Sequence, residues 1–296
     1  MKTIFHTSLI FFTALFLLSC KREQGGEQMK SVCYQASELK PGDYYYSDGT
    51  WSDGGLREWR VDSLVVESPK PHPLSGKKVI GIVFQVDSSR IGCREKESLK
   101  EMGIQQPRGL AMAVECVEKG KAYAWDGWGK KMGFSEETSM KECFFDIDGL
   151  AATEEYENRF SENSAISMVI NLNKQDSFQH KRTPWFVPST GQWWDILQNL
   201  GGAGILATEW AQNENIRGAF FWNRQYNVCD QLNFWMQGIP EEKKNLFGSK
   251  YDHYWSSSEF NRYRQRYIGI INKEGYLYMD WDAKGAWHKI RCVFAF

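Results

Sequence analysis

The sequence predicts a mixed α+β fold in which helices pack beside an antiparallel sheet. Three observations lead to this prediction. The segment Tyr254–Phe296 contains four short runs rich in β-branched and aromatic residues, separated by polar turns. The stretch Gly42–Ser52 reads GDYYYSDGTWS, with two aromatic runs around an Asp-Gly pair that is typical of a β-hairpin. Two further segments, Thr153–Leu172 and Ser189–Leu200, have apolar residues at helical spacing.

The first 19 residues have the features of a secretory signal. An apolar run, Leu9–Leu18, is too short to span a bilayer, and a small residue stands directly before Cys20. The tetrapeptide LLSC resembles the lipobox of bacterial lipoproteins, in which the cysteine carries the lipid and begins the mature chain. We expect a signal peptide at residues 1–19, a tether at 20–39 and one folded domain at 40–296. Plain secretion or a single N-terminal anchor is the alternative, and Lys21 after the cysteine favours, by resemblance, the outer membrane.

Composition limits the possible functions. The formal net charge is −1 at pH 7, and loss of Lys2 with the signal makes it −2, so nucleic acid is not an expected partner. Aromatic residues make up 15% of the chain, which suits an aromatic-rich β fold or a binding surface. The expected compartment permits disulfides, and we expect one or two bridges among six cysteines whose spacing matches no zinc site: Cys33, Cys93, Cys116, Cys143, Cys229 and Cys292.

Along the middle of the chain, apolar runs and charged stretches alternate. The run Lys78–Asp87 is nearly continuous and of strand length, so we expect a central strand there, and Gly109–Val117 predicts another. Charged residues dominate Arg90–Lys100, which predicts a solvated insertion. The stretch Gly218–Gly238 predicts a strand-like segment followed by a helix.

The two predicted main helices have recognisable starts. Acidic residues fill the first turn of Thr153–Leu172, where they suit the positive end of the helix dipole. The second helix begins after Pro188, because Ser189 stands three residues before Gln192 and the pair forms a capping box. We expect this helix to reach Leu200, where two glycines follow.

The tail segment predicts a meander. Lys273–Gly275 separates two strand runs and is typical of a hairpin, so up-and-down pairing brings the polar loops Asn261–Arg266 and Asp282–Trp287 to the same end of the sheet. Alternation places Leu277, Met279 and Trp281 on one face and Tyr276, Tyr278, Asp280 and Asp282 on the other. In the last run, one face is shared by Ile290, Cys292, Phe294 and Phe296, which predicts that this run is tied into the sheet.

The two polar loops carry the residue types that dominate binding hot spots. Arg262, Arg264 and Arg266 could clamp an acidic sugar or a carboxylate, and Tyr263 and Trp287 could stack on a ring. The alternative is that the charges pair across the sheet and bind nothing. The candidate ligand-binding residues are Asn261, Arg262, Tyr263, Arg264, Arg266, Asp280, Asp282, Lys284 and Trp287.

Five motifs occur in the order found in a known group of families. They are GDYYYSDGTWS at Gly42–Ser52, DGLAAT at Asp148–Thr153, WFVPSTGQWWDIL at Trp185–Leu197, YWSSSE at Tyr254–Glu259 and IRCVFAF at Ile290–Phe296. This pattern resembles the DUF1566 and Fibrobacter major paralogous domain families of Bacteroidetes surface lipoproteins, which are similar to C-type lectin-like domains of the formylglycine-generating-enzyme type.

The resemblance implies a small twisted antiparallel sheet with two main helices, adjacent first and last strands, and a ligand surface on the loops between the late strands. This chain departs from the family pattern by long insertions at Arg90–Gln106 and Ala203–Lys250. It also lacks the Glu-Pro-Asn and Trp-Asn-Asp triplets of calcium-dependent sugar-binding lectins.

These observations favour a lipid-anchored surface protein that binds a glycan or a surface protein without catalysis. One alternative is a structural or accessory subunit of a surface fibre. Another is a glycan-active enzyme that uses Asp280 and Asp282, two carboxylates on one strand face. The five histidines have no metal or triad spacing, so no cofactor or metal is expected, and the membrane is reached through the lipid on Cys20.

Overall fold

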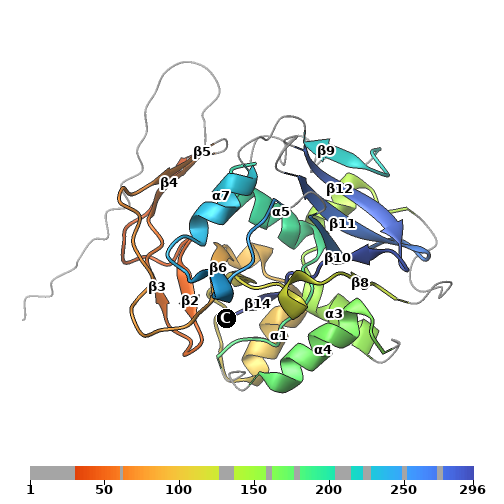
Figure 1. Ribbon diagram of the computed structural model, residues 1–296, viewed down its shortest axis with the longest axis horizontal. Coiled ribbons are helices and arrows are strands. Elements are labelled where there is room, and N and C mark those ends of the chain that lie inside the picture. The colour runs from red at the N-terminus through yellow and green to blue at the C-terminus, as the bar shows by residue number, and fades with distance from the viewer. Residues whose placement is uncertain are drawn as a thin grey trace, which may run out of the picture.

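A computed structural model describes residues 31–60, 63–126, 137–157, 162–176, 181–203, 215–222, 228–248, 252–271 and 276–296. The signal peptide, Cys20 and the loop Lys273–Gly275 lie outside the described residues. Within the described ranges the chain forms six α-helices and four antiparallel sheets (Figure 1). The expected mixed α+β class is confirmed.

The largest sheet has five strands in the order β14-β7-β6-β2-β3. Its central strand is β6 (Val79–Gln85), as expected for an apolar run that is covered on both faces. The predicted hairpin is formed by β2 (Tyr44–Tyr46) and β3 (Trp51–Ser52), and Gly49 at its turn has φ 80°, which glycine adopts without strain. The other two strands are β7 (Leu110–Ala113) and β14 (Val293–Ala295).

The second sheet contains most of the predicted meander. Its order is β10-β11-β12-β9, formed by β10 (His253–Asn261), β11 (Arg264–Ile271), β12 (Tyr276–Ala283) and β9 (Phe220–Trp222). The fourth run of the tail does not join it, so that part of the expectation was wrong. Instead β13 (Trp287–His288) pairs with β8 (Tyr123–Ala124), and β14 pairs with β7 in the five-stranded sheet.

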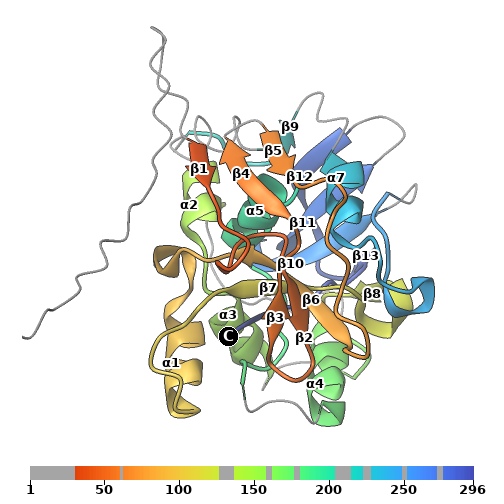
Figure 2. The ribbon, with the colours of Figure 1, turned by 90° about the vertical axis from the view of Figure 1, so that its left-hand side faces the viewer.

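A third sheet lies beside the five-stranded one, in the order β1-β4-β5 (Figure 2). It is formed by β1 (Ser31–Cys33), β4 (Leu56–Arg60) and β5 (Ser63–Val66). The first of these strands comes from the segment that the sequence assigned to the tether. Its backbone pairs with β4 while its side chains are exposed, so the apolar pattern gave no sign of it.

The helices confirm the expected starts of some elements and correct the expectation of one long helix over Thr153–Leu172. The helix α5 (Thr190–Asn199) begins with the predicted capping box, since the Ser189 and Gln192 side chains each accept from the other's backbone N–H. The segment expected as one helix forms two, α3 (Gly149–Glu157) and α4 (Ala165–Gln175), because Ser164 caps a new helix after a left-handed residue. The remaining helices are α1 (Cys93–Glu101), α2 (Met140–Phe145), α7 (Val228–Trp235) and the short η1 (Ser88–Arg90), η2 (Val117–Gly120) and η3 (Glu241–Lys243).

The charged stretch Arg90–Lys100 is not a solvated insertion. It forms most of α1, and Glu95 and Leu99 are fully buried there. The Glu95 carboxylate accepts from the Gln192 side chain at 2.8 Å and from the Leu150 N–H at 3.2 Å. This charged segment can therefore pack against the core, because polar groups donate hydrogen bonds to Glu95, its buried acid.

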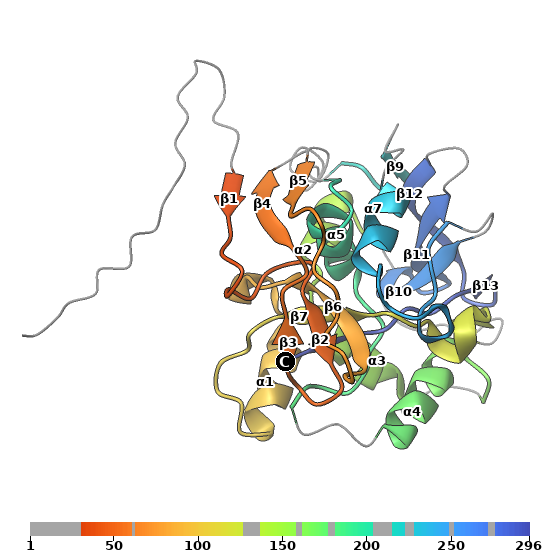
Figure 3. The same ribbon diagram turned by 60° about the vertical axis from the view of Figure 1, so that its left-hand side comes forward.

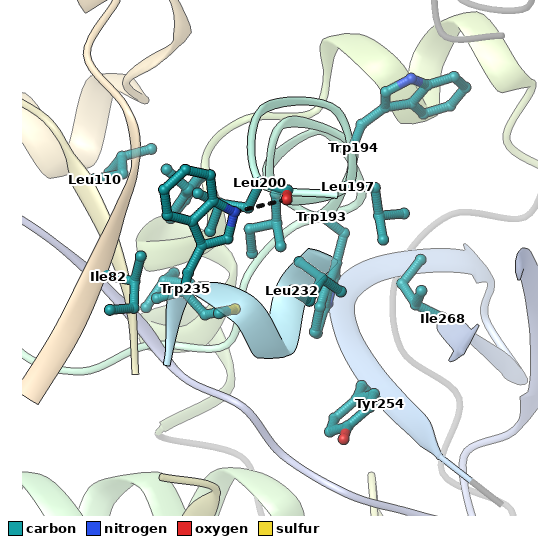
Figure 4. Packing of buried hydrophobic residues seen from close by; sticks show 14 of the residues in the cluster. Ile82, Leu110, Trp193, Trp194, Leu197, Leu200, Leu232, Trp235, Tyr254 and Ile268 are labelled. Carbon is teal, nitrogen blue, oxygen red and sulfur yellow. Dashed lines mark hydrogen bonds between the residues drawn. The ribbon is translucent and has the colours of Figure 1, made fainter. Parts of the chain in front are cut away.

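The main core lies between the two large sheets, where α5 and α7 pack against each other (Figure 1). Figure 4 shows Trp235 of α7 turned toward the end of α5, where its indole N–H donates to the Leu200 carbonyl at 2.8 Å. Trp193 and Trp194 of α5 are also fully buried in this cluster. The aromatic side chains of the sequence therefore serve mainly to pack the core.

A second cluster covers the other face of the five-stranded sheet, beside α4 (Figure 3). It contains the last run's predicted face, Ile290, Cys292, Phe294 and Phe296, which is confirmed. Within the described ranges Cys93, Cys116, Cys143, Cys229 and Cys292 have free thiols, so the expected bridges do not form, and four of these thiols are buried. None of the described helices has the length and apolar character that crossing a bilayer requires.

Candidate functional site

Two turns meet at one end of the four-stranded sheet. The turn between β10 and β11 is tight, and the Asn261 side chain accepts from the Tyr263 N–H at 2.9 Å. The turn between β12 and β13 lies against it, because the Lys284 N–H donates to the Tyr263 carbonyl at 3.3 Å. The two polar loops are therefore side by side, as hairpin geometry predicted.

Two exposed aromatic rings lie at this end of the sheet, Tyr263 in the turn between β10 and β11 and Trp287 at the first position of β13. Tyr263 is 51% exposed and Trp287 is 66% exposed, whereas most aromatic residues that the structure describes are buried. Arg262, which precedes Tyr263, is half-buried. We refer to Arg262, Tyr263 and Trp287 as the aromatic tip.

The sheet separates the remaining candidates into two groups. Residues directly opposite one another in a ladder share a face, so Arg264 and Arg266, opposite Ala283 and Trp281, lie on one face. Asp280 and Asp282, opposite Tyr267 and Gln265, lie on the other face. The arginines of β11 and the aspartates of β12 therefore neither pair with each other nor form one ligand surface.

Arg266 does not reach a ligand surface. Its side chain is fully buried, and its guanidinium donates to the Gly218 carbonyl at 2.5 Å and to the Thr138 carbonyl at 2.6 Å. It also lies over the Phe260 ring, 4.6 Å from the centroid. The assignment of Arg266 to a ligand clamp is corrected, because this residue ties the sheet to two neighbouring segments.

Lys284 is also an interior residue. Its side chain is 4% exposed, and its ammonium forms an ion pair with Glu259. The same Glu259 carboxylate accepts from the Tyr156 hydroxyl. The buried ion pair of Lys284 and Glu259, together with Tyr156, holds the turn in place. Lys284 therefore positions the turn and is not exposed for ligand binding.

On the face of the arginines, Arg264 belongs to a stack. Its guanidinium lies 3.7 Å from the centroid of the Trp281 ring, and Trp281 stacks on Phe260 with centroids 5.2 Å apart. Trp281 is half-buried and Phe260 is buried. Arg264 therefore covers an aromatic edge of the sheet and keeps part of its charge in water.

The aspartate face carries a cluster of aromatic and imidazole rings. The His288 ring stacks on Tyr267 with centroids 4.4 Å apart, and the Tyr278 hydroxyl and a nitrogen of His253 are 2.7 Å apart. Burial lowers the pKa of His288 to about 3, although Asp282 Oδ2 lies 3.3 Å from its Nε2. Burial outweighs this neighbouring carboxylate, so His288 is neutral at pH 7 and the contact is not an ion pair.

The two aspartates of this face are each bound to their own backbone. Burial raises the pKa of Asp280, and the Asp280 and Asp282 carboxylates each accept from the backbone N–H of the next residue. Among the described residues, no group of three His, Cys, Asp or Glu side chains could hold a metal ion.

Sequence reasoning missed two cavities that lie away from the tip residues. One has a volume of about 320 Å³ and is lined by polar residues, including Asp146 and Ser258, whose hydroxyl lies 2.5 Å from the Asp146 carboxylate. The other has a volume of about 510 Å³ and includes the buried Arg182. Their residues come from segments far apart in the chain, so no local motif marks either cavity.

No protein-family model matches this chain, and no curated protein sequence matches it. The resemblance to DUF1566-type domains therefore rests on the five motifs alone. The crystal structure of a fimbrial protein from Bacteroides ovatus ATCC 8483 is similar to this chain, with a TM-score of 0.49 and 14% identical residues. The match covers 87% of this chain and 49% of the other, so this chain spans about half the length of the protein it matches.

Proposed function

We propose that this chain is a non-catalytic accessory subunit of a bacterial surface fibre, anchored through a lipid on Cys20, and that the aromatic tip binds a neighbouring protein. The observation that carries the proposal is the exposure of Trp287, at the start of β13, and of Tyr263, in the turn between β10 and β11, at 66% and 51%. Exposed aromatic rings beside an arginine are the residue types that anchor protein interfaces. We also propose that the domain has the C-type lectin-like fold that the five motifs suggest.

The geometry favours a protein partner over a small ligand. The aromatic tip presents two exposed rings, and protein interfaces are commonly built around exposed aromatic anchors, whereas small-molecule sites are concave. Arg266 and Lys284 are buried in the interior, which leaves the half-buried Arg262 and Arg264 as the cations near this turn. The name of the Bacteroides ovatus protein agrees with this proposal, but so distant a similarity does not support it independently.

Photo-crosslinking in living cells tests the proposal. A benzoylphenylalanine placed at Trp287 or Tyr263 should crosslink the chain to a protein of a surface fibre. The same group at Leu74, which is 47% exposed and distant in the sequence, is the matched control and should not. Crosslinks that are lost on periodate treatment would instead identify a glycan ligand, and equal crosslinking from all three positions would contradict a specific tip.

A second measurement separates binding from folding. The double variant Trp287→Ala, Tyr263→Ala should lose the partner while its melting temperature stays within about 2 °C of the wild type, since exposed substitutions rarely change stability. Turnover of a chromogenic glycoside that is abolished by Asp280→Asn would overturn the non-catalytic part of the proposal.

A further inference from the structure

The hairpin that joins β10 to β11 carries two arginines that have no hydrogen-bond or ion-pair partner among the described residues. Arg262 lies in the turn, and Arg264 is the first residue of β11. The guanidinium nitrogens of both side chains reach the solvent, whereas the Nε–H of Arg266 is buried. A binding partner can therefore contact Arg262 and Arg264.

Arginines of this kind are exceptional in the part of the chain that the structure describes. The other described arginines donate to a carboxylate or to a backbone carbonyl, except Arg108. Arg108 is exposed and lies between α1 and β7, outside the aromatic tip. Arg262 and Arg264, in contrast, are two positions apart in the chain and flank the exposed Tyr263.

The guanidinium of Arg264 is also held in place by packing. It lies 3.7 Å from the centroid of the Trp281 ring, which in turn stacks on Phe260. A guanidinium that stacks on a ring still has its N–H groups, which lie in its own plane, available for hydrogen bonds. An arginine held in this way loses less conformational entropy when it binds a carboxylate.

The acidic residues of the neighbouring strands do not neutralise these two arginines. Glu259 of β10 forms an ion pair with the buried Lys284. Asp280 and Asp282 of β12 lie on the opposite face of the sheet from the stacked guanidinium. Glu137, on an adjoining segment, is exposed and, within the described ranges, forms no ion pair with either arginine. Charge complementarity at this turn therefore favours a partner that supplies a carboxylate.

We propose that Arg262 and Arg264 bind an acidic segment of the protein that the aromatic tip contacts, and that an Asp or Glu carboxylate of this segment pairs with Arg264. The inference rests on the proposed function, because it takes the partner at the tip to be a protein. Tyr263 packs against the same segment. Opposite charges across an interface select the correct partner, and like charges exclude others.

Acetate, which has the carboxylate of an Asp side chain, tests the site without the partner. Two-dimensional NMR spectra of the purified protein record the arginine Nε–H signals while acetate replaces chloride at constant ionic strength. The Arg264 signal should shift more than the Arg108 signal, because Arg108 is exposed but has no ring beneath it among the described residues. The variants Arg264→Lys and Arg108→Lys assign the two signals, since each variant lacks one of them.

Acetamide is the matched control for acetate, because it has the same shape and no charge. It should shift neither signal appreciably. Equal shifts of the Arg264 and Arg108 signals in acetate would contradict a carboxylate site at the turn. A shift of the Arg264 signal in acetamide as large as that in acetate would contradict it as well.

Crosslinking in living cells tests the acidic partner itself. With benzoylphenylalanine at Trp287, the added substitution Arg264→Glu should lower the yield of crosslinked partner about 10-fold or more, because like charges then face each other. Arg108→Glu, which makes the same charge change away from the tip, should leave the yield unchanged. If Arg264→Glu fails to fold, Arg264→Gln removes the charge, keeps a planar side chain and should still lower the yield.

A charge exchange completes the test. The crosslinked segment of the partner, mapped by mass spectrometry, should contain Asp or Glu, and its replacement by Lys should restore crosslinking to Arg264→Glu. A segment without an acid, or crosslinks that survive Arg264→Glu, would overturn the acidic partner and leave the proposed function standing. Absence of crosslinks from the chain with Arg264 intact would overturn the proposed function and, with it, a protein as the source of the carboxylate. The acetate titration would then still decide whether these arginines form an anion site.

Discussion

The guanidinium of Arg264 lies over the ring of Trp281, 3.7 Å from its centroid, and the opposite side of that ring stacks on Phe260. Arg266, two residues further along β11, lies over the other member of this stack at 4.6 Å. Two arginines therefore enclose two aromatic rings on one face of the sheet. Arg264 remains partly in water, and Arg266 is buried.

The first prediction concerns this stack. Trp281→Ala should lower the free energy of unfolding by about 3 kcal/mol, because it removes a large ring packed between Arg264 and Phe260. Arg264→Ala should cost about 1 kcal/mol, the usual value of a partly solvated cation–π contact together with its packing. Urea unfolding of both variants and of the double variant measures the coupling. If the two losses add without coupling, the contact contributes nothing to stability.

The second prediction compares the contributions of Arg266 and Arg262 to stability. Arg266→Ala should destabilise the protein by about 3 kcal/mol, because the Gly218 and Thr138 carbonyls lose a charged donor in the interior. Arg262→Ala, at the half-buried turn, should change stability by less than about 0.5 kcal/mol. Thermal and urea unfolding measure both. Similar losses in the two variants would contradict the division between an interior arginine and a tip arginine.

The third prediction concerns pH. The pKa of His288 is lowered to about 3 by burial, so between pH 6.5 and pH 3 the unfolded chain binds a proton that the folded chain does not. Stability should therefore fall as the pH falls through this window, by about 2 kcal/mol from this residue at pH 5. His253 and Asp282 also lie close to this ring, so the comparison is made between variants.

The variant His288→Phe should keep the ring stacked on Tyr267 and lose this part of the acid sensitivity. His72→Phe, which removes an exposed imidazole, is the matched control. Urea unfolding at pH 7 and pH 5 gives the difference for each protein. An unchanged pH dependence in His288→Phe would show that His288 accepts a proton in the folded state.

The fourth prediction concerns the buried acid of α1. Burial and the neighbouring Asp148 raise the pKa of Glu95 well above its usual value. The Glu95 carboxyl therefore loses its proton more readily in the unfolded chain than in the folded one. As the pH rises above about 4.5, Glu95 lowers the free energy of unfolding by an increasing amount. Glu95→Gln should raise the melting temperature at pH 8 and have a smaller effect at pH 4. Glu97→Gln, on the exposed side of the same helix, is the control, and a lower melting temperature of Glu95→Gln at pH 8 would contradict the prediction.

Local chemistry was readable from the sequence where one short segment determines its own structure. Ser189 and Gln192 specify the start of α5, and the Asp-Gly pair between β2 and β3 specifies a hairpin. The pairing of β14 with β7 could not be predicted, because neither segment has a sequence feature that specifies a partner strand so far away in the chain. The charged α1 was missed because its one buried acid is matched by Gln192 from another helix.

The candidate site was readable to the same extent. Hairpin geometry correctly brought Tyr263 and Lys284 together, because register follows from the turns. Alternation could not show that Arg266 is covered while Arg264 is not, since both point to the same side of β11. The difference arises from Thr138 and Gly218, which close over Arg266 from distant segments.

The pairing of β7 with β14 also determines when the five-stranded sheet can be completed during synthesis of the chain. Contacts across this junction join residues 178 positions apart, such as Ala113 and Arg291. At about 5–20 residues per second, a ribosome needs roughly 10–40 s to make the chain between them. Throughout that time one edge of β7 has no strand to pair with, so the five-stranded sheet is completed only after β14 has been made.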